Sequence, residues 1–273
     1  RRGLLCVRDR ILGSKFDPFK GLELANKFKL PTWVNVDRLE NRQELQQQFN
    51  TARKALDDNK TIDLYDCNTQ RAFEMVLSGK VEEAFDLSKE DDSLRDAYGR
   101  ISVGEKALLA RRLVQSGVSF VLVSGAWGYF DHHGDNVRWG GLVKGLKPLL
   151  PRVDRAYYAL VNDLEQRGML DDTLVMMMGE FGRSPKINAQ AGRDHWVPVM
   201  SMVMSGGGMQ MGQVIGSSDR VGGEIRSGKV RPQDLAATTF RHLGIDLDSN
   251  WIDAQGRPIP IIQEGGRPIA QLG

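Results

Sequence analysis

Apolar runs alternate with helical patterns after residue 101, and this alternation constrains the fold of the chain more than any other feature. The apolar runs are typical of strands buried on both faces, and they lie at 118–123, 173–178 and 199–204. The helical patterns before, between and after them cover 103–116, 141–167 and 232–243. The sequence therefore predicts an α/β fold with a largely parallel central sheet flanked by helices.

The first hundred residues differ, because helical patterns there are not separated by buried strands. Helices are predicted over 38–58 and 63–78, and shorter helical segments over 81–87 and 93–98. We expect residues 1–100 to form a mainly helical cap region that packs on the core. Residues 101–273 are expected to form the α/β core that bears the metal site, and the two parts together would make one domain.

Composition argues against two classes of partner. The 273-residue chain has 37 Lys and Arg against 35 Asp and Glu, and this net charge of +2 gives no reason to expect nucleic acid. No run approaches the roughly 18 apolar residues of a membrane span, so no span is expected. Two cysteines, Cys6 and Cys67, are too few for a disulfide framework and leave the redox compartment open.

Histidine is scarce, and its positions confine imidazole chemistry to the part of the chain after residue 131. The four histidines lie at 132, 133, 195 and 242. The first three are in loops beside the apolar runs, each with carboxylates nearby, and the loop after 173–178 adds another carboxylate. The candidate metal ligands from these loops are Asp131, His133, Glu180, Asp194 and His195.

Neighbouring strands would bring these loops together at one edge of the sheet, where ligands usually bind in α/β folds. Carboxylate oxygens and imidazole nitrogens then suit a divalent metal, with zinc expected and manganese or calcium as alternatives. Each loop alone also has an ordinary interpretation as a solvated turn, an ion-paired surface loop or a local cap. His242 lies in the last helix beside apolar residues, which favours a structural role.

Two arginines, Arg183 and Arg193, flank the same loops. A guanidinium near a metal can bind two oxygens of an anion at once, so both are candidate substrate-binding residues for a small anionic ester. The alternative is that they form ion pairs with Glu180 or Asp194.

Several segments resemble one large bacterial family. They read FDHHGDN at 130–136, GEFGRSPKIN at 179–188, GRDHW at 192–196, GQVIG at 212–216 and DLAAT at 234–238. From these motifs the chain is identified as a member of the domain of unknown function 1501 family, which is placed in the alkaline-phosphatase-like, or sulfatase-like, superfamily. The likeness covers nearly the whole chain.

The resemblance implies a metal-dependent hydrolase of phosphate or sulfate esters. Asp131, His133 and His195 match positions of one metal site, and Glu180 stands where the superfamily usually has an aspartate. Phe181 occupies the place of a second-site histidine, so a two-zinc site is not expected. The alternative function is a non-catalytic surface or scaffolding protein that retains the fold.

The resemblance also bears on the ends of the chain. The family's usual opening region is absent, so we expect a C-terminal portion that lacks the N-terminal strand or strands of the core. The catalytic nucleophile would lie in that missing segment, and the catalytic residues are therefore unknown. Relatives often look exported, which suggests a periplasmic or extracellular location. The oligomeric state stays open.

Overall fold

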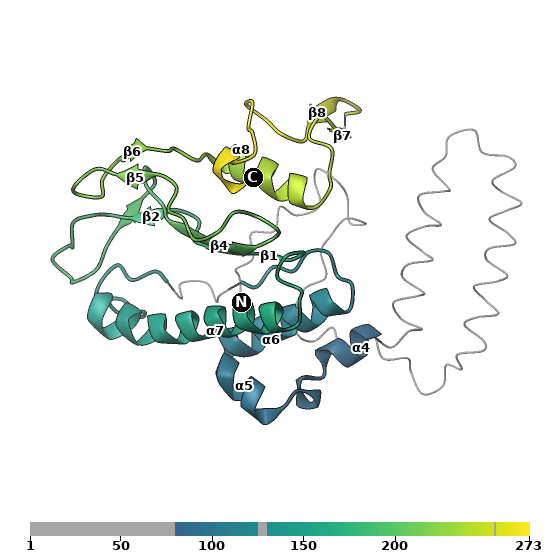
Figure 1. The fold of residues 1–273 in the computed structure, drawn as a ribbon. Helices are drawn as coiled ribbons and strands as arrows, with labels where there is room; N and C mark the ends of the chain where they lie inside the picture. Colours follow the sequence, from purple (N-terminus) through teal and green to yellow (C-terminus); the bar gives the residue numbers. More distant parts are fainter. Residues whose placement is uncertain (1–79, 125–129, 254) are drawn as a thin grey trace, which may run out of the picture. The chain divides into compact units, whose positions relative to one another are not determined.

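The computed structural model describes residues 80–124, 130–253 and 255–273 (Figure 1). The helices predicted over 38–58 and 63–78, as well as Cys6 and Cys67, lie outside the described residues. The chain divides into two compact units, one containing Asp92–Leu108 and Leu122–Gly273 and the other containing 80–91 and Leu109–Val121. The predicted division at residue 100 stays a prediction.

The helices of the described residues follow the sequence patterns closely. They are α4 (Lys80–Phe85), α5 (Asp92–Tyr98), α6 (Ser102–Gln115), α7 (Lys147–Gln166) and α8 (Pro232–His242). Single turns lie at η3 (Leu87–Lys89), η4 (Leu142–Leu146) and η5 (Ala270–Leu272). The predicted helix started at residue 141, but residues 142–146 form the π-helical turn η4, and the α-helix begins at Lys147. Pro148 lies in the first turn of α7, where backbone N–H groups have no partner within the helix, so its missing N–H costs no helical hydrogen bond. None of the described helices is long and apolar enough to cross a membrane.

The strands of the described residues pair in four separate antiparallel ladders. The pairs are β1 (Leu174–Met178) with β4 (Met202–Gly206), β2 (Gly182–Arg183) with β3 (His195–Trp196), β5 (Ser217–Ser218) with β6 (Ile225–Ser227), and β7 (Asn250–Ile252) with β8 (Pro258–Pro260). The largely parallel central sheet is not among the ladders of the described residues, and it stays a prediction.

Two of the predicted strands are present, and one is not. The run at 173–178 becomes β1, and the run at 199–204 becomes β4 with a shift toward Gly206. The run at 118–123 is irregular, with Phe120 61% and Leu122 72% exposed, so the prediction of a buried strand there was wrong. An apolar run favours a strand, but the strand also needs a hydrogen-bonding neighbour, and no described segment pairs with it.

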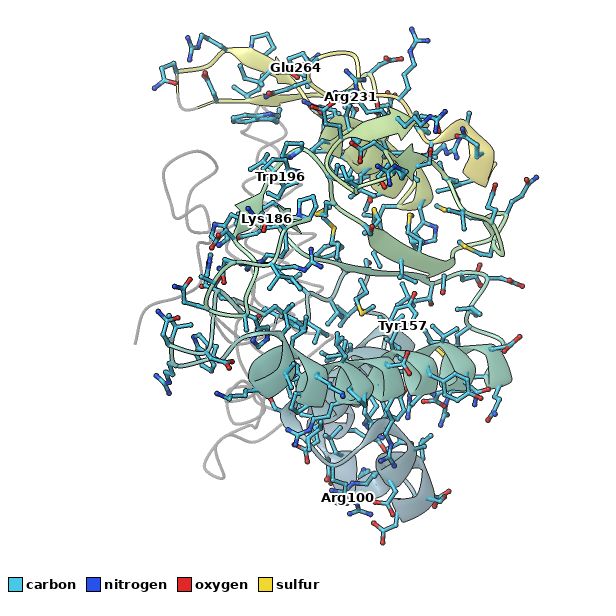
Figure 2. The ribbon with its side chains drawn as sticks, turned by 90° about the vertical axis from the view of Figure 1, so that its left-hand side faces the viewer. Arg100, Tyr157, Lys186, Trp196, Arg231 and Glu264 are labelled. Atoms are coloured by element: carbon cyan, nitrogen blue, oxygen red, sulfur yellow. The ribbon has the colours of Figure 1, made fainter. Side chains whose placement is uncertain are left out.

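The β1–β4 ladder lies between α7 and α8 (Figure 1). Its direct pairs alternate between faces, with Val175 opposite Ser205 and Met176 opposite Met204. On one face, the Tyr157 hydroxyl of α7 lies 2.9 Å from the Ser205 Oγ atom, and Figure 2 shows Tyr157 on the side of α7 toward the ladder. On the other face, the Thr239 hydroxyl of α8 approaches the Met176 sulfur at 3.8 Å. Both faces of this small sheet are thus covered by helices.

A buried polar contact joins α5 to α7. Tyr98 is completely buried, and its hydroxyl donates a hydrogen bond of 2.9 Å to Oδ2 of Asp163. The other oxygen of Asp163 accepts a 2.6 Å hydrogen bond from Nε of Arg167, one helical turn later. Because each donor has an acceptor, burial of these polar groups is compensated.

Candidate metal centre

The β2–β3 pair places two of the predicted site residues next to each other. Arg183 is directly opposite His195 in the register, so their side chains share one face. Beyond the ladder, the Ser184 N–H donates to the Asp194 carbonyl at 2.8 Å, which keeps the two segments together. Gly182 is needed for this approach, because a Cβ atom there would lie 1.7 Å from the carbonyl oxygen of Val199.

The loop that carries Asp131 and His133 is held against the same hairpin. The Arg193 N–H donates to the His132 carbonyl at 3.1 Å, and Gly134 forms an isolated antiparallel bridge with Ala191. A Cβ atom at Gly192 would lie 2.0 Å from the His133 carbonyl oxygen, so only glycine fits between the two loops. Segments about sixty residues apart in sequence thereby meet at one point.

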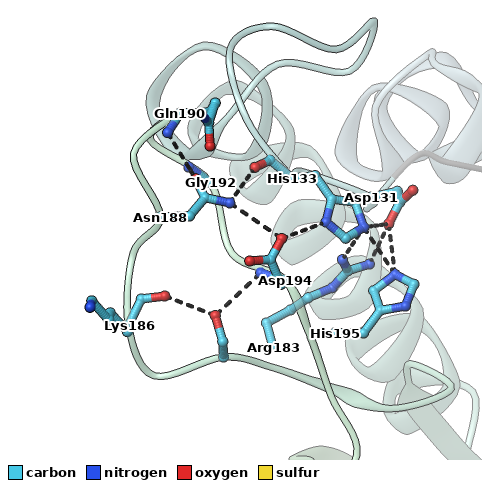
Figure 3. Close-up of polar contacts among 10 residues, drawn as sticks. Asp131, His133, Arg183, Lys186, Asn188, Gln190, Gly192, Asp194 and His195 are labelled. Atoms are coloured by element: carbon cyan, nitrogen blue, oxygen red, sulfur yellow. Dashed lines mark hydrogen bonds and ion pairs between the residues drawn. The ribbon is translucent and has the colours of Figure 1, made fainter.

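Three side-chain atoms converge where these loops meet (Figure 3). Nε2 of His133 lies 2.9 Å from Oδ1 of Asp131, and Nε2 of His195 lies 3.2 Å from the same oxygen. The two Nε2 atoms are 3.0 Å apart. Each of the three residues can thus offer one ligand atom to a common point.

Hydrogen bonding determines which nitrogen of His133 faces this point. Its Nδ1 atom lies 3.0 Å from Oδ1 of Asp194, and a carboxylate can only accept, so Nδ1 carries the hydrogen. In the neutral ring, Nε2 then presents a lone pair toward Oδ1 of Asp131, which is also an acceptor. A protonated His133 ring would instead donate from Nε2 to this oxygen.

The donor set and its spacing fit a zinc ion. Zinc is commonly bound by histidine nitrogens and carboxylate oxygens at about 2.0–2.2 Å, and tetrahedral ligands at that range are about 3.3 Å apart. The separations here are 2.9, 3.0 and 3.2 Å. Three protein ligands also leave one coordination position for another molecule, as in catalytic zinc sites.

Arg183 places a positive charge beside the cluster. Its Nη2 atom donates to Oδ1 of Asp131 at 2.9 Å, and its Nη1 atom lies 3.3 Å from Nε2 of His133. Burial alone would raise the pKa of the Asp131 carboxyl, but hydrogen bonds from Arg183 and His195 and the nearby positive charge outweigh it and lower the pKa. The hydrogen bond from His133 likewise lowers the pKa of Asp194.

The remaining predicted residues have different places. Asp194 lies behind His133, on the nitrogen that points away from the cluster. Arg193 donates to the carbonyls of Ser184 and Pro185, both at 2.6 Å, and so ties the loop rather than pairing with an acid. Glu180 is exposed and has no ion-pair partner among the residues that the structure describes.

Phe181, predicted to replace a second-site histidine, packs against the cluster. Its ring centroid lies 4.4 Å from that of His195, in a tilted arrangement. The Arg183 guanidinium carbon is 5.9 Å from the same ring. An apolar ring at this place offers no ligand atom, so within the described residues the cluster can form one three-ligand site only.

One residue of the site was not singled out by sequence reasoning. Asn188 donates from Nδ2 to the His133 carbonyl at 2.8 Å and to Oδ1 of Asp194 at 3.3 Å (Figure 3). The available signal was local: asparagine is typical of turns in which its side chain binds the backbone two residues later, here at Gln190. That signal predicts a turn but does not show which residues the turn will reach.

Comparison with known proteins bears on the whole chain. The family model described as Protein of unknown function (DUF1501) matches residues 11–272. The chain belongs to the DUF1501 family. No curated protein and no solved structure matches it. The DUF1501 match includes every loop that carries Asp131, His133 and His195, and it confirms the family expected from the sequence motifs.

Proposed function

We propose that Asp131, His133 and His195 bind one divalent cation, with zinc as the best fit, and that this DUF1501 protein hydrolyses phosphate or sulfate esters. The observation that carries the proposal is the convergence of one carboxylate oxygen and two imidazole nitrogens within 3.2 Å of one another. We also propose the alkaline-phosphatase-like core, with its parallel sheet, as the fold that would present this site.

The side chains around the cluster would have different roles in the reaction. A bound cation would polarise the ester oxygen and stabilise the negative charge that develops during transfer. Arg183 lies at the edge of the cluster, where its planar guanidinium can hold two oxygens of an anionic group. Asp194 keeps the proton on Nδ1 of His133. Asp131 and His195 are used as ligands, so the nucleophile is expected outside the described residues.

The hydrogen bonds of the two predicted arginines favour Arg183 over Arg193 as the substrate-binding residue. Arg193 already donates to two backbone carbonyls, whereas Arg183 faces the cluster with both terminal nitrogens. We therefore assign Arg183 the role of binding the small anionic substrate. Arg193 is assigned to loop stability.

A non-catalytic scaffold with a structural cation is the second candidate. The observation that favours it is Phe181, whose ring centroid lies 4.4 Å from that of His195 and which occupies the place of the superfamily's second-site histidine. A single site without a nearby nucleophile would stabilise the loops without turning over an ester.

Two measurements on the full-length protein test these proposals. Elemental analysis after purification without chelators is expected to find about one equivalent of metal, and its absence from both wild type and metal-reconstituted protein would overturn the metal site. A panel of aryl phosphates and sulfates with added Zn²⁺ or Mn²⁺ is expected to reveal turnover. Turnover should disappear in Arg183→Ala and His195→Ala variants that remain folded. Stoichiometric metal without turnover of any ester would favour the scaffold.

A further inference from the structure

We infer that Asn188 is a positioning residue of the metal centre, which holds Asp194 against His133 and so directs the Nε2 lone pair of His133 toward the cluster. The inference rests on the proposed cation site, but its structural part concerns contacts that exist without a cation. Asn188 does not belong to the ligand set, so it would act entirely through His133 and Asp194.

All hydrogen-bonding capacity of the Asn188 side chain is directed into the site loops. Its Oδ1 atom accepts from the Gln190 N–H at 3.1 Å and from the Gly192 N–H at 3.0 Å. Since backbone N–H groups can only donate, these two contacts determine which end of the amide is oxygen. The Nδ2 group must then point the other way, toward His133 and Asp194.

The Nδ2 group contacts both halves of the same ligand arrangement. It donates to the backbone carbonyl of His133 at 2.8 Å and to Oδ1 of Asp194 at 3.3 Å. That carboxylate oxygen is the one that lies 3.0 Å from Nδ1 of His133. The backbone of His133, the proton on its ring and the carboxylate that holds this proton are thus linked by one amide group.

Other contacts already hold the loops together, which separates positioning from general stability. Arg193 donates to the Ser184 and Pro185 carbonyls, and the Arg193 N–H donates to the His132 carbonyl. These bonds do not involve Asn188. Loss of its side chain would therefore release the His133–Asp194 pair more than it would release the loops.

Metal affinity provides the first test, with the full chain and Zn²⁺ as the probe. Competition with a chromophoric chelator should show Zn²⁺ binding weakened by about 10- to 100-fold in Asn188→Ala, the range typical for groups that orient metal ligands. Asn188→Asp keeps the acceptor but removes both donors and places a second carboxylate beside Asp194. Its Zn²⁺ affinity should therefore fall by at least as much as that of Asn188→Ala. Asn136→Ala is the matched control, because Asn136 is exposed in the same loop as His133 and should bind Zn²⁺ as wild type does.

A double-mutant cycle distinguishes a positioning role from an unspecific one. If Asn188 acts through Asp194, Asn188→Ala should weaken Zn²⁺ binding much less in an Asp194→Ala background than in the wild type. Fully additive losses would overturn the inference. So would wild-type affinity in both Asn188 variants while His195→Ala abolishes binding.

The metal-free protein provides a readout that does not depend on the proposed function. Long-range ¹H–¹⁵N spectra at a pH where His133 is neutral should show its hydrogen on Nδ1 in wild type and Asn136→Ala. A mixture of tautomers is expected in folded Asn188→Ala or Asn188→Asp. An unchanged tautomer in the folded variants would overturn the inference. If wild type binds no Zn²⁺ but the tautomer shifts as expected, the metal proposal alone fails.

Discussion

Two polar clusters of this protein use similar groups in opposite ways. In the helical cluster, Asp163 receives one hydrogen bond from Tyr98 and one from Arg167, and it lies almost fully buried. In the loop cluster, a single oxygen of Asp131 faces two imidazole nitrogens and a guanidinium, in a partly exposed position. Each contains an aspartate with an arginine, yet of these two clusters only the loop cluster brings three possible ligand atoms to one point.

The difference lies in how donors and acceptors are matched. A buried acceptor that has one donor for each oxygen is satisfied and contributes to stability. One carboxylate oxygen and two imidazole nitrogens that can each offer a ligand atom to the same point suit cation binding better than they suit stabilisation of the fold. We therefore expect substitutions in the helical cluster to affect folding and those in the loop cluster to affect metal binding.

The largest effect is expected for His195→Ala. This substitution removes one of three ligand atoms, so Zn²⁺ affinity should fall by more than the 10- to 100-fold typical for an orienting residue. Chelator competition measures the loss. His242→Ala is the control, since His242 lies in the last turn of α8, and equal losses in both variants would contradict the assignment of the ligands.

Asp163→Ala should instead destabilise the fold. It deprives the buried Tyr98 hydroxyl of its acceptor and Arg167 of its carboxylate, which should lower the free energy of unfolding by about 2–3 kcal/mol. Urea denaturation measures this change, with the exposed Glu165→Ala in the same helix as control. A loss of Zn²⁺ affinity without a loss of stability in Asp163→Ala would contradict the expectation that the helical cluster affects folding and the loop cluster affects metal binding.

The metal-free protein should depend on pH through Asp131. Its pKa is lowered in the folded state, so the unfolded chain binds the proton more readily. The stabilising contribution is complete above the ordinary aspartate pKa of about 3.9 and is lost as the pH falls through the folded pKa. The free energy of unfolding should therefore fall less steeply between pH 5 and about pH 2 in Asp131→Asn than in the wild type. Parallel curves for wild type and variant would contradict it.

The smallest effect is expected for Glu180→Gln. Although its position in the sequence made it a candidate ligand, Glu180 is exposed and outside the group of converging atoms. Zn²⁺ affinity and stability should both stay at the wild-type values. A loss of affinity comparable to that of His195→Ala would show that the loop moves to bring Glu180 into the site.

Much of the local structure could be predicted, because it depends on neighbours in the sequence. Helical periodicity located α6 and α8 within one or two residues, and the methionine-rich run became β1. The run at 118–123 shows the limit of this approach. Its apolar composition is typical of a strand, but pairing depends on a distant segment, and here none of the described residues provides it.

For the site, the sequence by itself determined which residue types lie in the loops and that imidazole is confined to the chain after residue 131. Only the tertiary structure decided that Asp131, His133 and His195 converge, that Asp194 lies behind His133 and that Glu180 lies apart. The physical reason is that a residue type is a property of one position, whereas a binding site depends on distances of about 3 Å between side chains. Glycines at 182 and 192 permit the close backbone approach that sets those distances, and contacts some sixty residues apart complete it.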